Sequence, residues 1–171
     1  TTIIPINCND PGDSVGLVVP CGKIKIVNEN NEEINQGETG ELWIKGPMVV
    51  PGYWKNEKAT QNSFENGYWK SGDIASQDEN GFVRIHDRKK DMINRGGYKI
   101  LSAEIENLMM LMDQVQEAAL VPYPCPILGE RSHAFIFPSS ASIEPNEIRL
   151  QLSEKVADYK VPDKITITKE P

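Results

Sequence analysis

Polar and apolar residues alternate in the first half of the chain with the two-residue period of short β-strands. Glycine, proline and asparagine separate these runs, and the Asn-Gly pair of Asp78-Glu79-Asn80-Gly81 is typical of a hairpin turn. The predicted strands are Lys23–Val27, Glu41–Lys45, Gly72–Ala75 and Phe82–Ile85. A polar segment, Asn56–Phe64, predicts a short surface helix. The first half is therefore expected to be a β-rich unit.

The period changes after the charged stretch Asp87–Asp91. Ser102 can cap a helix whose apolar residues recur at i, i+3, i+4 and i+7. Those residues are Ile105, Leu108, Met109 and Met112. Two apolar runs follow, then a helix from Glu144-Pro145 that Pro162 would end, then an alternating strand. The runs are Ala118–Val121 and Ala134–Phe137, and the last strand is Ile165–Thr168. The second half thus predicts an α+β unit.

Composition excludes several classes of protein. The chain of 171 residues is 39% hydrophobic and 25% charged, which is typical of a globular protein, and no apolar run reaches the roughly 18 residues of a membrane-spanning helix. A net charge of −7 without a basic face argues against nucleic-acid binding. Cys8, Cys21 and Cys125 form no close pair, so we expect neither a disulfide scaffold nor a zinc site but a cytoplasmic protein. With only His86 and His133, we expect no metal centre.

Asp73 is the first candidate for a binding residue. A carboxylate that follows glycine at the start of a strand can accept two hydrogen bonds from a vicinal diol, as acidic residues do for ribose. The alternative is an aspartate that only caps a turn. The residues alone leave both readings open.

Six cations within 16 residues form a second candidate, because arginine and lysine bind phosphate. They are Arg84, Arg88, Lys89, Lys90, Arg95 and Lys99. The alternative is a solvated hairpin and linker, since runs of charge usually face water. Gly96-Gly97 within the same stretch allows a tight turn or a close approach of backbone to a ligand.

Taken in order, several motifs resemble the adenylate-forming superfamily, which includes acyl-CoA synthetases, aryl-CoA ligases, luciferases and adenylation domains. The resemblance runs from about Gly16 over nearly the whole remaining chain. The matching segments are Gly37–Pro47, Pro51–Trp54, Gly67–Asp73, Asp87–Ile93, Gly96–Ile100 with Glu104–Glu106, and Tyr159–Pro162. Ser71 stands where the family usually has threonine, which keeps the hydroxyl group.

The resemblance implies an ATP-dependent acid–thiol ligase. In such enzymes a carboxylate attacks the α-phosphate of ATP to give an acyl-adenylate and pyrophosphate, while Mg²⁺ offsets the phosphate charge. A thiol, commonly that of coenzyme A, then displaces AMP. The resemblance assigns Asp73 to the ribose hydroxyls, Arg88 to the nucleotide, and Lys90 to a hinge between two domains. It also places Gly96, Gly97 and Tyr98 in a loop that lines the pantetheine tunnel.

The same resemblance implies a division into 1–87, the last β-rich subdomain of the AMP-binding domain, a hinge at 88–90, and 91–171, an incomplete C-terminal α+β domain. The family's phosphate loop would precede Thr1 and its adenylation lysine would follow Pro171, so we expect no catalytic residue in this chain and no activity from the chain alone. The absence of an initial Met favours excision from a longer protein. The alternatives are a non-catalytic nucleotide- or protein-binding module of the same fold, or the adenylation domain of a carrier-protein system.

Overall fold

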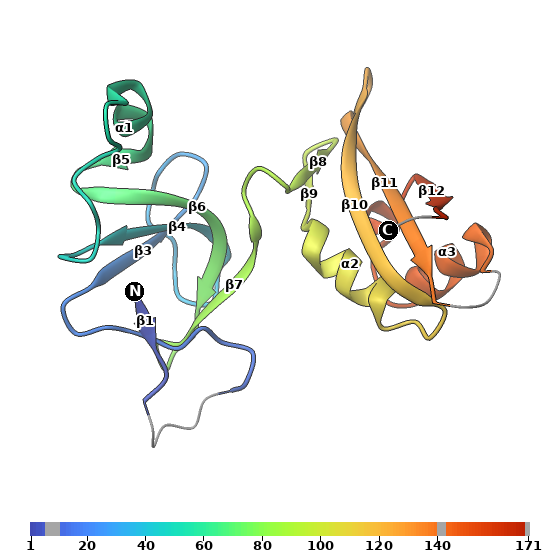
Figure 1. Cartoon of the computed structure of the whole chain (residues 1–171), viewed down its shortest axis with the longest axis horizontal. Coiled ribbons are helices and arrows are strands. Elements are labelled where there is room, and N and C mark those ends of the chain that lie inside the picture. The colour runs from blue at the N-terminus through green and yellow to red at the C-terminus, as the bar shows by residue number, and fades with distance from the viewer. Residues whose placement is uncertain (6–10, 140–142, 170–171) are drawn as a thin grey trace. The chain divides into compact units, whose positions relative to one another are not determined.

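The computed structural model describes residues 1–5, 11–139 and 143–169. The chain forms two compact units, Thr1–Lys89 (unit 1) and Lys90–Pro171 (unit 2), which are described separately below (Figure 1). The division falls between two lysines of the segment 88–90. Whether this segment works as a hinge stays a prediction.

An antiparallel sheet of five strands forms the centre of unit 1 (Figure 1). Its order is β3-β4-β6-β5, and β7 pairs with β6. The strands are β3 (Lys23–Val27), β4 (Gly40–Lys45), β5 (Phe64–Glu65), β6 (Tyr68–Gln77) and β7 (Val83–Arg88). A separate two-stranded sheet pairs β1 (Thr2–Ile3) with β2 (Leu17–Val18). The predicted β-rich first half is confirmed.

The local signals of unit 1 act as the sequence predicts. The side chain of Asp78 accepts hydrogen bonds from the backbone of Asn80 (3.0 Å) and Phe82 (2.9 Å), which closes the β6–β7 hairpin. The surface helix is α1 (Glu57–Ser63), and the Asn56 side chain caps it by accepting a hydrogen bond from the backbone of Ala59 (3.0 Å).

The two faces of the unit 1 sheet differ. One face packs an apolar core, as the alternation of its strands requires, and consists of Ile26, Leu42, Ile44, Ala75 and Val83. On the other face Trp43 is fully buried between the ammonium groups of Lys25 and Lys70, which lie 4.3 and 4.7 Å from its ring centroid. A tryptophan covered in this way is part of the structure and is not free to stack on a base.

Unit 2 is an α+β unit, as predicted (Figure 1). Its sheet has the order β10-β11-β8-β9, and β12 pairs in parallel with β11. The elements are β8 (Ile93–Arg95), β9 (Tyr98–Ile100), α2 (Ser102–Met110), β10 (Val115–Cys125), β11 (Gly129–Pro138), α3 (Pro145–Ser153), a 3-10 turn η1 (Asp158–Lys160) and β12 (Lys164–Ile167). The core includes Ile105, Met109, Ile136, Ile148 and Leu152.

Two sequence-based predictions for unit 2 are wrong, and one element was missed. Ser102 does not cap α2, because it is the first residue inside the helix and its hydroxyl donates to the backbone oxygen of Asp91 (2.6 Å). The helix α3 ends at Ser153, well before Pro162, and η1 fills the interval. The hairpin β8–β9 was not predicted, because its strands are only three residues long.

Composition led to predictions that the described residues address only in part. Cys21 and Cys125 are free thiols, and Cys8 lies outside the described residues. Within the described ranges, each helix is too short or too polar to cross a bilayer. These ranges also contain no group of three or more His, Cys, Asp or Glu side chains arranged to hold a metal ion.

Candidate functional site

Asp73 is positioned in unit 1 by an irregularity in the β4–β6 ladder. Glu41 pairs with Ile74 and Trp43 pairs with Lys70, so the three residues Ser71–Asp73 lie opposite the single residue between them on β4. Gly72 takes a φ of +74°, a conformation that other residues rarely adopt. The extra residues bend β6 locally and break the regular alternation just before Asp73.

Hydrogen bonds hold this bulge in place. The hydroxyl of the buried Ser71 donates to the backbone oxygen of Leu42 (2.8 Å) and accepts a hydrogen bond from the backbone of Asp73 (3.0 Å). A threonine could make the same two bonds, which explains why serine at this position keeps the geometry. The backbone that carries the Asp73 carboxylate is therefore fixed from both sides.

Arg88 on β7 is the register partner of Asp73 and also its ion-pair partner. Their side chains meet at 3.0 Å, from Nη1 to Oδ1. The Asp73 side chain is 21% exposed and the Arg88 side chain 57% exposed, so both reach solvent. Carboxylate oxygens that reach solvent can accept hydrogen bonds from a diol, and the remaining guanidinium donors can bind an anion. The structure thus brings together the two residues that the resemblance assigned to the nucleotide.

Other cations of the basic stretch also have carboxylate partners within unit 1. Arg84 binds Asp13 (3.0 Å) and Asp78 (2.9 Å), and these hydrogen bonds raise its pKa above the ordinary arginine value. Lys89 binds Glu41 (2.9 Å). These pairs bring carboxylates close to several cations of the stretch, and the role of the stretch in binding phosphate stays a prediction.

Gly96 and Gly97 form the two-residue turn of the hairpin β8–β9 in unit 2. Their φ values of +61° and +91° are both positive, which is the requirement of a type I′ turn. Gly96 donates its backbone N–H to the oxygen of Leu128 (2.8 Å), and Gly97 donates to the Asn94 side chain (3.1 Å). The turn has a defined shape and little side-chain bulk, so a ligand can approach its backbone.

Tyr98 follows this turn and is 59% exposed. Its ring stacks on Tyr159 of η1, with centroids 4.6 Å apart and planes 25° apart. Next to the stack, Lys160 forms a two-oxygen ion pair with Glu104 of α2 at 2.7 Å. The sequence analysis did not link Tyr159 to the glycine turn, because 61 residues separate Tyr159 from Tyr98.

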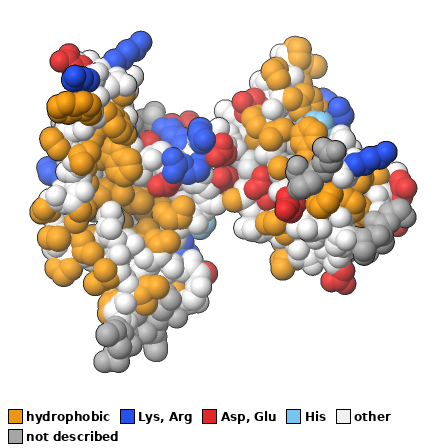
Figure 2. Space-filling view, viewed as in Figure 1, with side chains coloured by type: hydrophobic (Ala, Val, Ile, Leu, Met, Phe, Trp, Pro, Cys, Tyr) orange, Lys and Arg blue, Asp and Glu red, His pale blue; other side chains and the backbone are white. Residues whose placement is uncertain are grey.

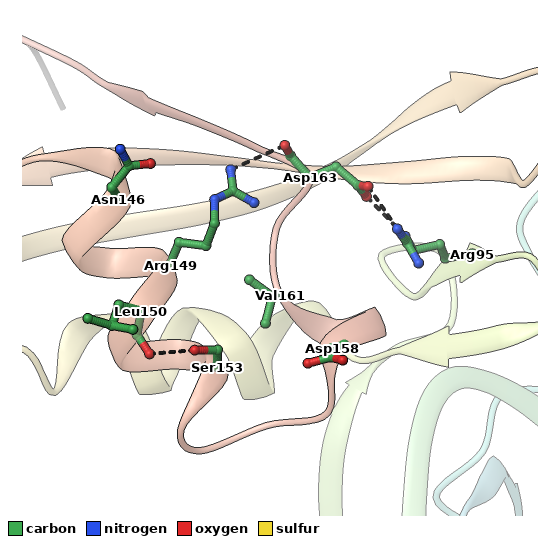
Figure 3. A pocket seen from close by; sticks show the side chains of 8 residues that line it. All are labelled: Arg95, Asn146, Arg149, Leu150, Ser153, Asp158, Val161 and Asp163. Carbon is green, nitrogen blue, oxygen red and sulfur yellow. Dashed lines mark hydrogen bonds and ion pairs between the residues drawn. The ribbon is translucent and has the colours of Figure 1, made fainter.

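A pocket of about 460 Å³ lies beside α3 and β12 in unit 2 (Figure 3). Its lining residues are Arg95, Asn146, Arg149, Leu150, Ser153, Asp158, Val161 and Asp163. Arg95 binds the Asp163 carboxylate with two hydrogen bonds (3.1 and 2.9 Å), and Arg149 donates to the backbone oxygens of Pro162 (2.6 Å) and Asp163 (3.3 Å). Only Arg95 among these residues was singled out from the sequence.

The Asp163 carboxylate stays ionised because of this environment. Burial favours the neutral acid, but hydrogen bonds from Arg95 and from the backbone of Ser132, with the charge of Arg131, outweigh burial. They hold the pKa of Asp163 below its ordinary value of 3.8. The pair also raises the pKa of Arg95. Arg95 ends the strand that enters the Gly96–Gly97 turn, so this ion pair anchors the turn to the residue directly before β12.

Two protein-family models match the chain. The model of AMP-binding enzymes matches residues 1–54, and that of the C-terminal domain of AMP-binding enzymes matches residues 104–171. A long-chain-fatty-acid–CoA ligase of Yersinia pestis is 36% identical over 158 residues, which are 92% of this chain and 28% of the ligase. A 2,3-dihydroxybenzoate-AMP ligase of Bacillus subtilis is 36% identical over 85% of this chain and 28% of its own length.

Solved structures give the same result. The o-succinylbenzoate CoA synthetase of Bacillus subtilis, in complex with its acyl-adenylate intermediate, has a TM-score of 0.86 at 30% identity and matches 94% of this chain and 33% of its own. An ATP-bound RpMatB-BxBclM chimera has a TM-score of 0.91 at 28% identity and matches 99% of this chain and 34% of its own. The chain therefore spans about a third or less of each of these proteins. Two family models in the expected order, and relatives alike in sequence and fold, establish that this chain belongs to the adenylate-forming family of AMP-binding enzymes.

Proposed function

We propose that the chain acts as part of an ATP-dependent acid–thiol ligase that converts a carboxylic acid, ATP and coenzyme A into an acyl-CoA, AMP and pyrophosphate. The observation that carries this proposal is the Asp73–Arg88 pair on the bulge of β6. It presents a carboxylate and a guanidinium to solvent on a rigid strand pair, which suits the ribose and phosphate groups of one nucleotide.

In this proposal Asp73 accepts hydrogen bonds from both ribose hydroxyls, and Arg88 donates to the nucleotide while orienting the carboxylate. ATP supplies the adenylyl group and releases pyrophosphate, and Mg²⁺, when bound, would offset the charge of the phosphates. The described residues offer no set of metal ligands, so we assign none of them to Mg²⁺. The contribution of these residues is binding and orientation, which are major parts of nucleotidyl-transfer catalysis.

The second half of the proposal concerns the thiol step. Lys90 is assigned to the hinge at which unit 2 turns between the two half-reactions, and the turn Gly96–Gly97 with Tyr98 is assigned to the pantetheine tunnel. Two observations support this assignment. The two glycines with positive φ leave the backbone of the turn without side chains, and the stacking of Tyr98 on Tyr159 fixes the residue that follows the turn. The chain contains no catalytic residue in this proposal.

An exposed apolar loop in unit 1 supports a role within a larger protein. Met48, Val50, Tyr53 and Trp54 are all exposed, Trp54 to 86%. Hydrophobic side chains also cover much of the visible face of unit 1 (Figure 2). Such surfaces commonly mark an interface, and the relatives are more than three times as long as this chain.

The proposal is tested in a polypeptide of the relatives' full length that includes this chain. ATP–pyrophosphate exchange is measured with a panel of fatty and aromatic acids, and thioester formation is measured with coenzyme A. Asp73→Asn should raise the KM for ATP strongly, whereas Glu79→Gln should not, because Glu79 is exposed in the turn at the far end of the same hairpin. Unchanged ATP kinetics in Asp73→Asn would return Asp73 to the role of a turn cap.

The main alternative is that the thiol acceptor belongs to a carrier protein and not to coenzyme A. The 2,3-dihydroxybenzoate-AMP ligase and the pyochelin synthase PchD are 36% and 35% identical to this chain, close to the values for the CoA ligases. The same exchange assay covers both cases, because adenylate formation precedes transfer. Thioester formation with coenzyme A, compared with a carrier-protein thiol, then distinguishes them. The 171-residue chain alone should show no exchange.

A further inference from the structure

Glu41 and Lys89 form an ion pair in unit 1 that no step of the proposed reaction uses. Glu41 lies on β4, and Lys89 directly follows the last residue of β7. Lys89 Nζ is 2.9 Å from Glu41 Oε2, and the Glu41 side chain is only 9% exposed. A carboxylate that is removed from water needs a charged partner far more than a surface carboxylate does. Lys89 supplies that partner.

The backbone of Lys89 is held as well as its side chain. Its N–H donates to the backbone oxygen of Gly72 at 2.7 Å, and Gly72 is the positive-φ residue of the bulge that carries Asp73. Lys89 is therefore tied to β6 through its backbone and to β4 through its ammonium group. These two attachments fix the segment directly after Arg88 to the sheet.

Lys90 differs from Lys89 although the two are neighbours in sequence. Lys90 is exposed, and its ammonium lies 4.0 Å from the carboxylate of Asp91, the next residue. Within the described ranges its backbone N–H donates no hydrogen bond. The chain thus passes from a doubly anchored residue to an unanchored one across a single peptide bond.

We propose that Glu41 is a positioning residue that clamps Lys89, so that rotation of the backbone begins at Lys90 and leaves the Asp73–Arg88 pair undisturbed. This inference rests on the proposed function, because it gives the hinge at Lys90 a fixed side. A hinge transmits a defined rotation only when one of its sides is immobile. Without the ion pair, a single backbone hydrogen bond to Gly72 would hold Lys89 to the sheet.

If the ion pair clamps Lys89, its loss should speed amide exchange only near Lys89. If the ion pair merely stabilises the sheet, its loss should speed amide exchange throughout the sheet. Amide hydrogen exchange, followed residue by residue by NMR on the 171-residue chain, separates the two cases. In the unmodified protein the Lys89 amide should exchange slowly and the Lys90 amide quickly. Glu41→Gln and Lys89→Met should each speed exchange at Lys89 by about tenfold, which corresponds to about 1.4 kcal/mol.

Two controls accompany these variants. Glu65→Gln removes an ion pair of similar length in the same sheet, between Glu65 and Lys70 (2.8 Å), and should leave exchange at Lys89 unchanged. Lys89→Arg keeps the charge and should retain most of the protection. The core amides of β4 and β6 should exchange alike in all variants. Unchanged exchange at Lys89 in Glu41→Gln, or a uniform acceleration over β4 and β6, would overturn the proposal.

A kinetic readout links the clamp to the reaction. In the full-length polypeptide, Glu41→Gln should lower the rates of pyrophosphate exchange and of thioester formation at least about fivefold compared with Glu65→Gln. The two variants should have the same unfolding midpoint. Equal rates in the two variants would contradict a positioning role. A full-length protein that shows no exchange at all would refute the proposed function, whereas the amide result on the 171-residue chain would stand.

Discussion

The two units hold their candidate binding residues by different physical means. In unit 1 the residues are charged, and strand register and ion pairs position them, as in Asp73–Arg88 and Glu41–Lys89. In unit 2 the candidate turn at Gly96–Gly97 is uncharged, and its shape follows from positive φ values and from packing around it. Unit 1 should therefore respond mainly to changes of charge, and unit 2 mainly to changes of backbone conformation and packing.

The aromatic residues allow the two units to be followed separately. All three tryptophans, Trp43, Trp54 and Trp69, lie in unit 1. Tryptophan fluorescence therefore reports the unfolding of unit 1 alone. NMR signals of the core amides of unit 2 report the unfolding of unit 2. Each substitution below can thus be assigned to the unit that it destabilises.

The greatest loss of stability is expected from a change of charge in unit 2, although unit 2 should otherwise respond mainly to changes of backbone conformation and packing. Asp163→Asn removes the charge from both Arg95 hydrogen bonds and should destabilise unit 2 on the order of 1.5–3 kcal/mol. Urea unfolding followed by unit 2 amides measures it, with Asp113→Asn, an exposed aspartate, as control. An effect as small as that of the control would mean that packing alone holds the turn.

The same ion pair predicts a pH dependence. The pKa of Asp163 is lowered in the folded chain, so the unfolded state binds the proton more tightly and acid favours unfolding. The contribution of the pair is complete above the ordinary value of 3.8 and is lost as the pH falls through the lowered pKa. The stability of Asp163→Asn should therefore decrease less than that of the unmodified chain in this acidic range.

Lys90→Pro probes the link between the units. Proline fixes φ near −65° and removes a backbone donor, so it restricts the dihedral change of a hinge. In the full-length polypeptide it should raise the activation free energy of the thiol step by about 1–3 kcal/mol, which is the usual cost of an enforced backbone conformation. The activation free energy of adenylation should rise less. Pyrophosphate release and thioester formation from preformed adenylate measure the two steps, and an equal loss in both would argue against a hinge.

Matched glycine substitutions sharpen the comparison. Gly72 and Gly97 have φ values of +74° and +91°, and an added Cβ meets no atom within 4 Å at either position. Alanine should therefore cost about 1–2 kcal/mol at each, from backbone strain alone. Gly72→Ala should raise the KM for ATP, and Gly97→Ala should raise the KM for coenzyme A. The reverse pattern would contradict the assignment of the two sites.

The smallest effect concerns the stack of Tyr98 on Tyr159. Tyr159→Ala should cost about 0.5–1.5 kcal/mol beyond the loss of buried area and should raise the KM for coenzyme A, because the turn loses its support. Tyr159→Phe keeps the ring and should behave like the unmodified protein. An equal loss in both variants would assign the effect to the hydroxyl.

The sequence predicted elements with strong local signals well. The β6–β7 hairpin was predicted because Asp78 and the following Asn-Gly pair favour a turn by themselves. The capping of α1 by Asn56 is equally local. Ser102 shows the limit of such signals, since its hydroxyl binds the oxygen of Asp91 and caps nothing. Tertiary contacts outweighed the local preference at that residue.

Some candidate residues could be named from the sequence, whereas Glu41 was identified only from the fold. Asp73, Arg88, Lys90 and the Gly96–Tyr98 loop were named from motifs, and their functional roles remain predictions. Glu41 carried no signal of its own, because the strand pattern accounted for it as one more polar position on β4. Only the fold brings it to within 2.9 Å of Lys89, 48 residues away.

Local sequence patterns were enough to predict the β-rich first half, the α+β second half, the change of pattern near residue 88 and the family. They were enough because alternation, turn residues and contiguous motifs are properties of neighbouring residues. Only the tertiary structure decided which charges pair, namely Arg88 with Asp73, Lys89 with Glu41, and Arg95 with Asp163. Those pairings depend on strand register and on long-range closure of the chain, and a run of six cations in a linear sequence does not contain that information.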